Sequence, residues 1–261
     1  MTRTRRARAA RPKEPLPPAL PPAERTVGQL VAESIRLYGR RFWPALLLGL
    51  PLAVADQLAL DLNALGRVLV LLAFAPVFTL GYAVATTLAV PDRPGGGWPV
   101  AMLVGTVVFV PAALFFPWFA LASVAWLGLA GLVVPVALVE RTGARATIRR
   151  AVQLGRADYV HAAGSLATLV LLFWMTRIAL ALVLRSQADN TVRVAVFLAD
   201  VVLAPLLFLG PALLYFDQAA RVGSPSRRAR RRSTSDADLP DADDAHRTGR
   251  SDAQVESRPP A

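Results

Sequence analysis

The sequence contains no cysteine, two histidines and a single lysine, Lys13. Without cysteine there can be no disulfide, thiolate metal site or cysteine nucleophile. His161 and His246 are the only imidazoles, too few for a histidine metal cluster. The phosphate-binding loop, zinc-protease and serine-hydrolase motifs are also missing. We therefore expect a protein that is not an enzyme and that needs no cofactor or metal.

Apolar residues are abundant instead, and they are separated from the charges. Hydrophobic residues make up 54% of the 261 positions, and the net charge is +11. The mean hydropathy is +0.44. Long apolar runs lie between Trp43 and Phe216, and a run of roughly 20 helical residues crosses a hydrocarbon core about 30 Å thick. The sequence predicts an all-α, multi-pass transmembrane bundle.

About six spans are predicted inside one transmembrane domain, residues 25–220. Their approximate bounds are 44–60, 68–90, 100–115, 118–139, 162–184 and 194–216. The third and fourth come from one apolar stretch, Val100 to Val139, which we divide at the aromatic and proline-containing segment 115–118. Aromatic residues and proline suit a membrane boundary. An interrupted or re-entrant arrangement of this stretch is the alternative.

Two amphipathic helices are predicted at the membrane surface, at about 26–42 and 143–155. Thr26 and Gln29 have the spacing of a capping box, and Gly155 is a suitable C-terminal stop. Aligning residues 34–45 with 151–162 pairs similar apolar positions, which suggests a parallel internal repeat. Chance similarity between two amphipathic helices explains the alignment equally well.

The arginines indicate the orientation. They gather near the span ends that share a side with the N-terminus, whereas the opposite loops hold only Arg67, Arg185 and Arg193. By the positive-inside rule both termini are cytoplasmic. The basic, proline-rich residues 1–24 and the polar residues 221–261 are predicted to be disordered tails. Arginine in place of lysine, with much alanine, suggests a bacterial chain, hence the bacterial plasma (inner) membrane.

The cytoplasmic arginines are candidate contacts for anionic lipid headgroups or for a membrane-protein partner. The candidates are Arg145, Arg149, Arg150, Arg40 and Arg41. The positive-inside pattern alone also accounts for them. No folded reader or interleaved aromatic residues accompany the arginine-rich tails, so specific nucleic-acid binding is not expected.

Three ionisable residues fall within predicted spans: Asp56, Arg177 and Asp200. Each is costly in hydrocarbon, so each should have a partner. Arg177 is eight residues before Arg185, and Asp200 is seven after Arg193, which places both about 10–12 Å from the outer end. We predict an intramembrane Arg177–Asp200 ion pair, with Asp56 as the alternative acid. The pair would either lock spans together or line a polar pathway.

Three segments resemble a known family. They are Thr26–Leu30 with Ser34–Tyr38 and Phe42-Trp43; Pro135–Glu140 with Gly143–Ala146, Arg149-Arg150 and Leu154; and Leu214–Asp217. Together they resemble the membrane domain that is fused to some glycerophosphoryl diester phosphodiesterases and stands alone in many bacterial membrane proteins. Ala151 stands where that pattern would have serine. The resemblance implies a six-helix membrane domain, and it implies no phosphodiesterase activity, because the catalytic barrel is not present.

The sequence thus favours a non-enzymatic membrane scaffold or regulatory membrane domain with a basic cytoplasmic face. The alternative is a small transporter or permease-like subunit that uses Asp56, Arg177 and Asp200. A lipid-modifying enzyme is a third interpretation, which would require a carboxylate or histidine cluster at one interface.

Overall fold

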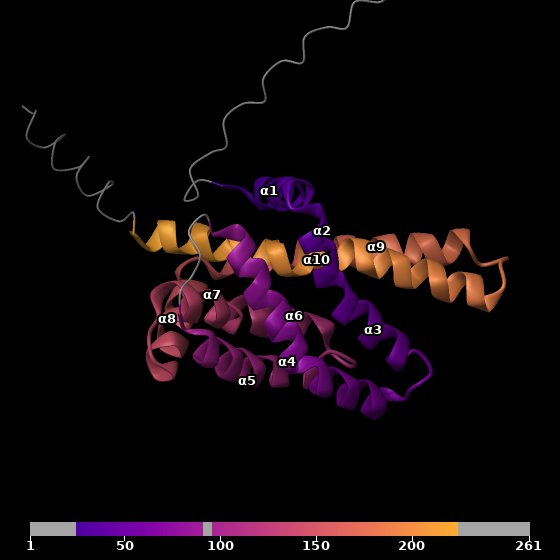
Figure 1. Cartoon of the computed structure of the whole chain (residues 1–261), viewed down its shortest axis with the longest axis horizontal. Coiled ribbons are helices and arrows are strands. Elements are labelled where there is room, and N and C mark those ends of the chain that lie inside the picture. Colours follow the sequence, from indigo (N-terminus) through magenta and orange to yellow (C-terminus); the bar gives the residue numbers. More distant parts are fainter. Residues whose placement is uncertain (1–24, 91–95, 224–261) are drawn as a thin grey trace, which may run out of the picture.

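The computed structural model describes residues 25–90 and 96–223, and within these ranges the regular structure is entirely helical (Figure 1). The elements are α1 (Val27–Arg40), α2 (Phe42–Leu46), η2 (Leu47–Gly49), α3 (Leu50–Ala59), α4 (Ala64–Ala89), α5 (Trp98–Phe115), α6 (Ala120–Ala130), α7 (Val133–Glu140), α8 (Ala144–Ala157), α9 (Tyr159–Val183) and α10 (Asp189–Gly223). The predicted disorder of residues 1–24 lies outside the described residues, as does that of 224–261.

Six helical segments are long and apolar enough to cross a membrane. They are Phe42–Ala59, Ala64–Ala89, Trp98–Phe115, Ala120–Glu140, Tyr159–Val183 and Asp189–Val222. The predicted fold class, a multi-pass helical bundle with six spans, is confirmed, and the chain is an integral membrane protein. Residues 100–139 form two antiparallel segments, since the chain turns at 116–119 between α5 and α6.

The six spans pack as three antiparallel hairpins arranged in a ring. The hairpins are α3 with α4, α5 with α6 and α7, and α9 with α10. The second helix of each hairpin packs against the first helix of the next: α4 against α5, α6 against α9, and α10 against α3. Buried side chains from all six spans join one core cluster, and α10 also contacts α4 across the ring.

Helices α1 and α8 correspond to each other, as the repeat hypothesis requires. Both have 14 residues, both end at a non-helical residue (Arg41 or Asp158), and both lead directly into a span. Buried Leu30 and Ser34 of α1 stand 117 positions before buried Thr147 and Ala151 of α8. Each also packs on the preceding hairpin of the ring, α1 on α9–α10 and α8 on α5–α7. These correspondences favour a true repeat over chance similarity.

Helix α1 begins with the predicted capping box, but it lies along the flank of the bundle. The Thr26 hydroxyl accepts from the Gln29 amide, and the Gln29 side chain accepts from the Thr26 amide. Arg25 contacts Asp217, whereas Ser34 faces Gly210, about 10 Å earlier along α10. Helix α1 therefore runs obliquely beside α10 instead of across its end (Figure 1).

Helix α8 covers the ends of α6 and α7 (Figure 1). Gly155 does not stop this helix, which continues to Ala157. A Cβ on Gly155 would collide with the Leu129 carbonyl, so the glycine allows α8 to approach α6 closely. The predicted tail boundary at residue 221 is also wrong, because α10 continues to Gly223.

Candidate functional site

Arg177 of α9 stands between two carboxylates from two other helices. Its Nη2 atom donates to Asp56 Oδ2 of α3 at 2.6 Å. Its Nε atom is 3.6 Å from Asp200 Oδ1 of α10, too far for a hydrogen bond but within ion-pair range. The structure therefore brings the three predicted residues together. The tighter partner is Asp56, the alternative acid, and not Asp200.

The guanidinium of Arg177 is further enclosed by aromatic rings from its own helix. Its Cζ atom lies 5.6 Å from the ring centre of Phe173 and 5.5 Å from that of Trp174, within the range of cation–π attraction. Asp200 is fully buried, and neither of its carboxylate oxygens has a hydrogen-bond partner among the described residues. One guanidinium therefore compensates two carboxylates, and it links the three helices α3, α9 and α10.

A second ion pair lies between the end of α3 and the start of α10. Arg193 of α10 contacts Asp61 at 3.1 Å, and its carbonyl accepts from Gln57 of α3 at 3.3 Å. This pair is exposed to solvent, so it contributes little to stability. The pair lies where the apolar contact between α3 and α10 ends and both helices become exposed.

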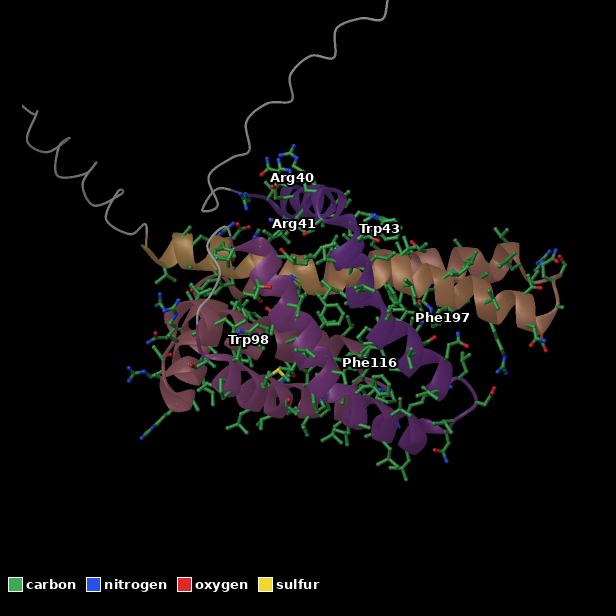
Figure 2. The ribbon with its side chains drawn as sticks, viewed as in Figure 1. Arg40, Arg41, Trp43, Trp98, Phe116 and Phe197 are labelled. Atoms are coloured by element: carbon green, nitrogen blue, oxygen red, sulfur yellow. The ribbon has the colours of Figure 1, made fainter. Side chains whose placement is uncertain are left out.

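The five predicted headgroup contacts divide into two separate groups. Arg145 and Arg149 are exposed on α8 and make no ion pair with another described residue. Arg150 forms an ion pair with Glu140 at 3.1 Å, and this pair links α8 to α7. Arg40 and Arg41 project from the flank at α1, near Trp43 (Figure 2). The structure therefore does not contain a single continuous basic face with all five arginines.

A polar network at the other end of the bundle, beside the start of α1 and the end of α10, was missed in the sequence. Arg25 contacts the fully buried Asp217 at 3.2 Å. Arg221 donates to the Asp158 carboxylate and to the Arg25 carbonyl, the latter at 2.9 Å. Asp158 also caps α9 by accepting from the His161 amide at 3.2 Å. Asp217 and Arg221 are four residues apart in sequence, which places them on one face of a helix. This spacing could have predicted a polar group at the end of the last span.

Glu140 extends this network to α7 and α8. Its Oε1 atom accepts from Arg150 at 3.1 Å and from the Tyr215 hydroxyl at 3.3 Å. Side chains thereby connect the start of α1, the end of α7, helix α8, the start of α9 and the end of α10. The arrangement holds α8 and its exposed arginines in a fixed position on the bundle.

A cavity of about 230 Å³ lies at the centre of the ring of hairpins, and side chains from all six spans line it. Its lining is almost wholly apolar, and neither Asp56 nor Arg177 nor Asp200 takes part in it. The intramembrane charges and the cavity are therefore separate features of the bundle.

Within the described residues, no group of three histidine, aspartate or glutamate side chains is placed to hold a metal ion. Comparison of the chain with protein-family models, with curated proteins and with solved structures gave no match. The function must therefore be argued from the geometry of the bundle itself.

Proposed function

We propose that this protein is a non-enzymatic membrane scaffold or regulatory domain whose α8 arginines bind anionic headgroups at the cytoplasmic leaflet. The observation that supports this is the division of α8 into two faces. Thr147, Ala151 and Leu154 are buried against the bundle, whereas Arg145 and Arg149 are exposed. The polar network around Glu140 holds α8 in place through Arg150. Arg145 and Arg149 therefore have a fixed arrangement, and neither forms an ion pair with another described residue.

Ile148 lies on α8 between the two exposed arginines and is itself 44% exposed. An exposed branched apolar side chain beside two cations suits the boundary between headgroups and acyl chains. Arg40, Arg41 and Trp43 lie on the flank beside α10, away from α8, so we do not include them in this headgroup site. The resemblance to the stand-alone bacterial membrane-domain family, and a plasma-membrane location with both termini inside, are part of this proposal.

The second candidate is a transporter or permease-like subunit, and the observation in its favour is the burial of two carboxylates beside one guanidinium. The cavity argues for the first candidate, because an apolar chamber that none of the three charged residues lines offers a polar solute no binding groups. The Arg177 cluster then serves to hold α3, α9 and α10 together.

The proposed headgroup site predicts a charge-dependent lipid preference. Removing Arg145 and Arg149 together should weaken binding of phosphatidylglycerol about thirtyfold, since each surface arginine contributes about 1 kcal/mol. Native mass spectrometry of R145Q/R149Q with phosphatidylglycerol or phosphatidylcholine measures this. R185Q is the matched control, because Arg185 is an exposed arginine at the opposite end of α9, and it should leave binding unchanged. Equal binding of both lipids by the unsubstituted protein would contradict the proposal.

A further inference from the structure

The charges of the Arg177 cluster do not balance. The guanidinium of Arg177 carries one positive charge, whereas the carboxylates of Asp56 and Asp200, when both are ionised, carry two negative charges. The ionised cluster then has one excess negative charge in an apolar part of the bundle. An uncompensated charge in such surroundings is costly, and it is neutralised by a further cation or by a proton. One more positive charge would make the cluster neutral.

Asp56 and Arg177 are the charged side chains that face Asp200. The segments α2 and η2 also pack on α10, with η2 at the residue after Asp200, and neither contains a charged residue. The charged residue of α4, Arg67, donates to a backbone carbonyl at 3.1 Å, and Arg193 of α10 forms the exposed ion pair described above. Other charged residues that bond to α10 do so near its end; they are Arg25, Glu140 and Asp158. Another described side chain therefore does not supply the further positive charge.

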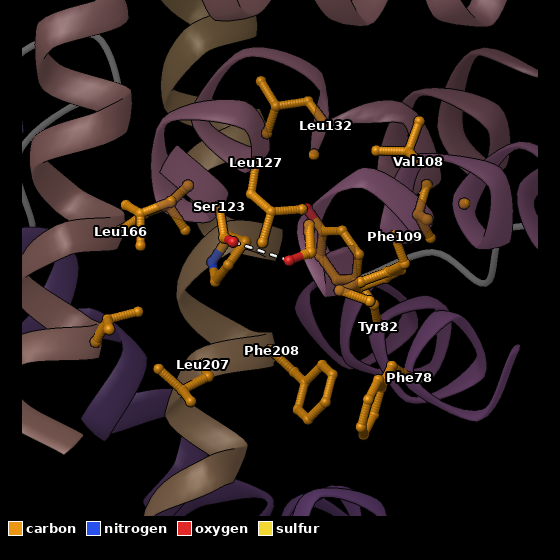
Figure 3. A pocket seen from close by; sticks show the side chains of 18 of the residues that line it. Phe78, Tyr82, Val108, Phe109, Ser123, Leu127, Leu132, Leu166, Leu207 and Phe208 are labelled. Carbon is orange, nitrogen blue, oxygen red and sulfur yellow. Dashed lines mark hydrogen bonds between the residues drawn. The ribbon is translucent and has the colours of Figure 1, made fainter. Parts of the chain in front are cut away.

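A metal ion or an organic cation does not fit beside Asp200. Both of its carboxylate oxygens are enclosed by protein atoms, so a ligand with a volume of its own does not reach them. Hard metal ions bind several oxygen ligands, and among the described residues no group of three acidic or histidine side chains is placed to hold one. The central cavity (Figure 3) provides no space for a cation either, because none of the three charged residues lines it. A proton needs no cavity, since a carboxylate oxygen holds it.

Asp56 offers such a proton both a hydrogen-bond acceptor and a route of entry. Its carboxylate lies on the same guanidinium as that of Asp200, and the two carboxylates are close enough to interact directly. A protonated carboxyl group donates one hydrogen bond, so the acid form of one residue can bind the carboxylate of the other. The side chain of Asp56 is 26% exposed, and the exposed Asp61 follows five positions later. A proton can therefore reach the buried Asp200 through Asp56.

We propose that Asp56 and Asp200 together bind one exchangeable proton, with Arg177 as the fixed cation beside them. A hydronium ion in the adjoining water gives up the proton, an O–H bond forms on one carboxylate, and a water molecule is left. The cluster is then neutral, because the remaining carboxylate is balanced by Arg177. Release of the proton to water restores the repulsion between the two carboxylates and weakens the contact between α3 and α10. This site is independent of the proposed headgroup binding at α8.

Infrared spectroscopy of the full-length protein in lipid vesicles detects the bound proton, because a protonated carboxyl group has a C=O stretching band that a carboxylate lacks. The spectrum is recorded at a pH roughly two units above the usual aspartate pKa of about 4, where exposed aspartates are ionised. The unsubstituted protein should show a carboxylic acid band that D200N removes and that shifts in heavy water. D56N should remove the same band, since either variant leaves one carboxylate balanced by Arg177. Mildly alkaline buffer should also remove it.

D217N and D61N are the matched controls. Asp217 is fully buried like Asp200, Asp61 is exposed, and each forms an ion pair with an arginine outside the cluster. Both variants should keep the band that D200N removes. If D200N fails to fold, D56N still decides, because Asp56 is partly exposed. The absence of a band that D200N removes, or its persistence in D56N, would overturn the assignment of a shared proton.

Discussion

Replacing Arg177 with methionine should lower the free energy of unfolding by about 3–5 kcal/mol. The substitution leaves the carboxylates of Asp56 and Asp200 in the apolar part of the bundle without their shared cation, which stands 2.6 Å from the first and 3.6 Å from the second. Because Asp200 is fully buried, water cannot take over from the guanidinium. Denaturant unfolding of R177M in mild detergent, followed by tryptophan fluorescence, measures the loss.

Two further variants show whether the loss comes from uncompensated charge. R193M removes the exposed Arg193–Asp61 pair on the same helices and should cost less than about 1 kcal/mol. D56N/R177M/D200N removes all three charges and should recover most of the stability lost in R177M, since a buried ion pair gains little over neutral groups of the same shape. An R177M protein as stable as the unsubstituted one would refute the structural role of this cluster.

Replacing Arg25 with methionine should release α1 from the flank of the bundle. Arg25 is the cation in contact with the fully buried Asp217, and Arg221 nearby is already engaged by Asp158. Leaving that carboxylate uncompensated should cost about 3 kcal/mol, the lower end of the range for a broken buried pair. Hydrogen exchange of the α1 amides should become faster than in the unsubstituted protein, while α4 and α5 should be unaffected.

The Arg36–Glu33 pair supplies the control on the same helix. It is partly exposed, its residues are three positions apart, and R36M should cost about 0.2–0.5 kcal/mol with slow α1 exchange retained. R25M/D217N should restore protection of α1, because the neutral amide needs no cation. Unchanged exchange in R25M would show that apolar packing alone holds α1 in place.

Local patterns in the sequence were sufficient to predict that these helices form. Thr26 and Gln29 predicted the start of α1 because a capping box depends on residues three apart in one turn. The six spans followed from the length of apolar runs, which hydrocarbon thickness sets without reference to tertiary contacts. The depth of Arg177 and Asp200 could also be counted along their helices, so their proximity was predictable.

The rotation of each helix about its axis and the angles at which the helices cross could not be predicted from local sequence patterns. Asp56 became the tighter partner of Arg177 because α3 packs against α10, a contact between segments that are 130 or more residues apart in sequence. The position of α1 depends on the Arg25–Asp217 pair, whose residues are 192 positions apart in sequence. Side chains from all six spans enclose the central cavity, and no single stretch of sequence could have predicted it.

The most direct test of the six-span account is the accessibility of single cysteines from the two sides of a sealed membrane. The chain has no cysteine of its own, so R149C on α8 and R185C beyond α9 each carry one reactive thiol. The account predicts that a membrane-impermeant maleimide added outside intact cells labels R185C alone, and that R149C reacts only after the membrane is opened. Labelling of both residues from the same side would contradict it.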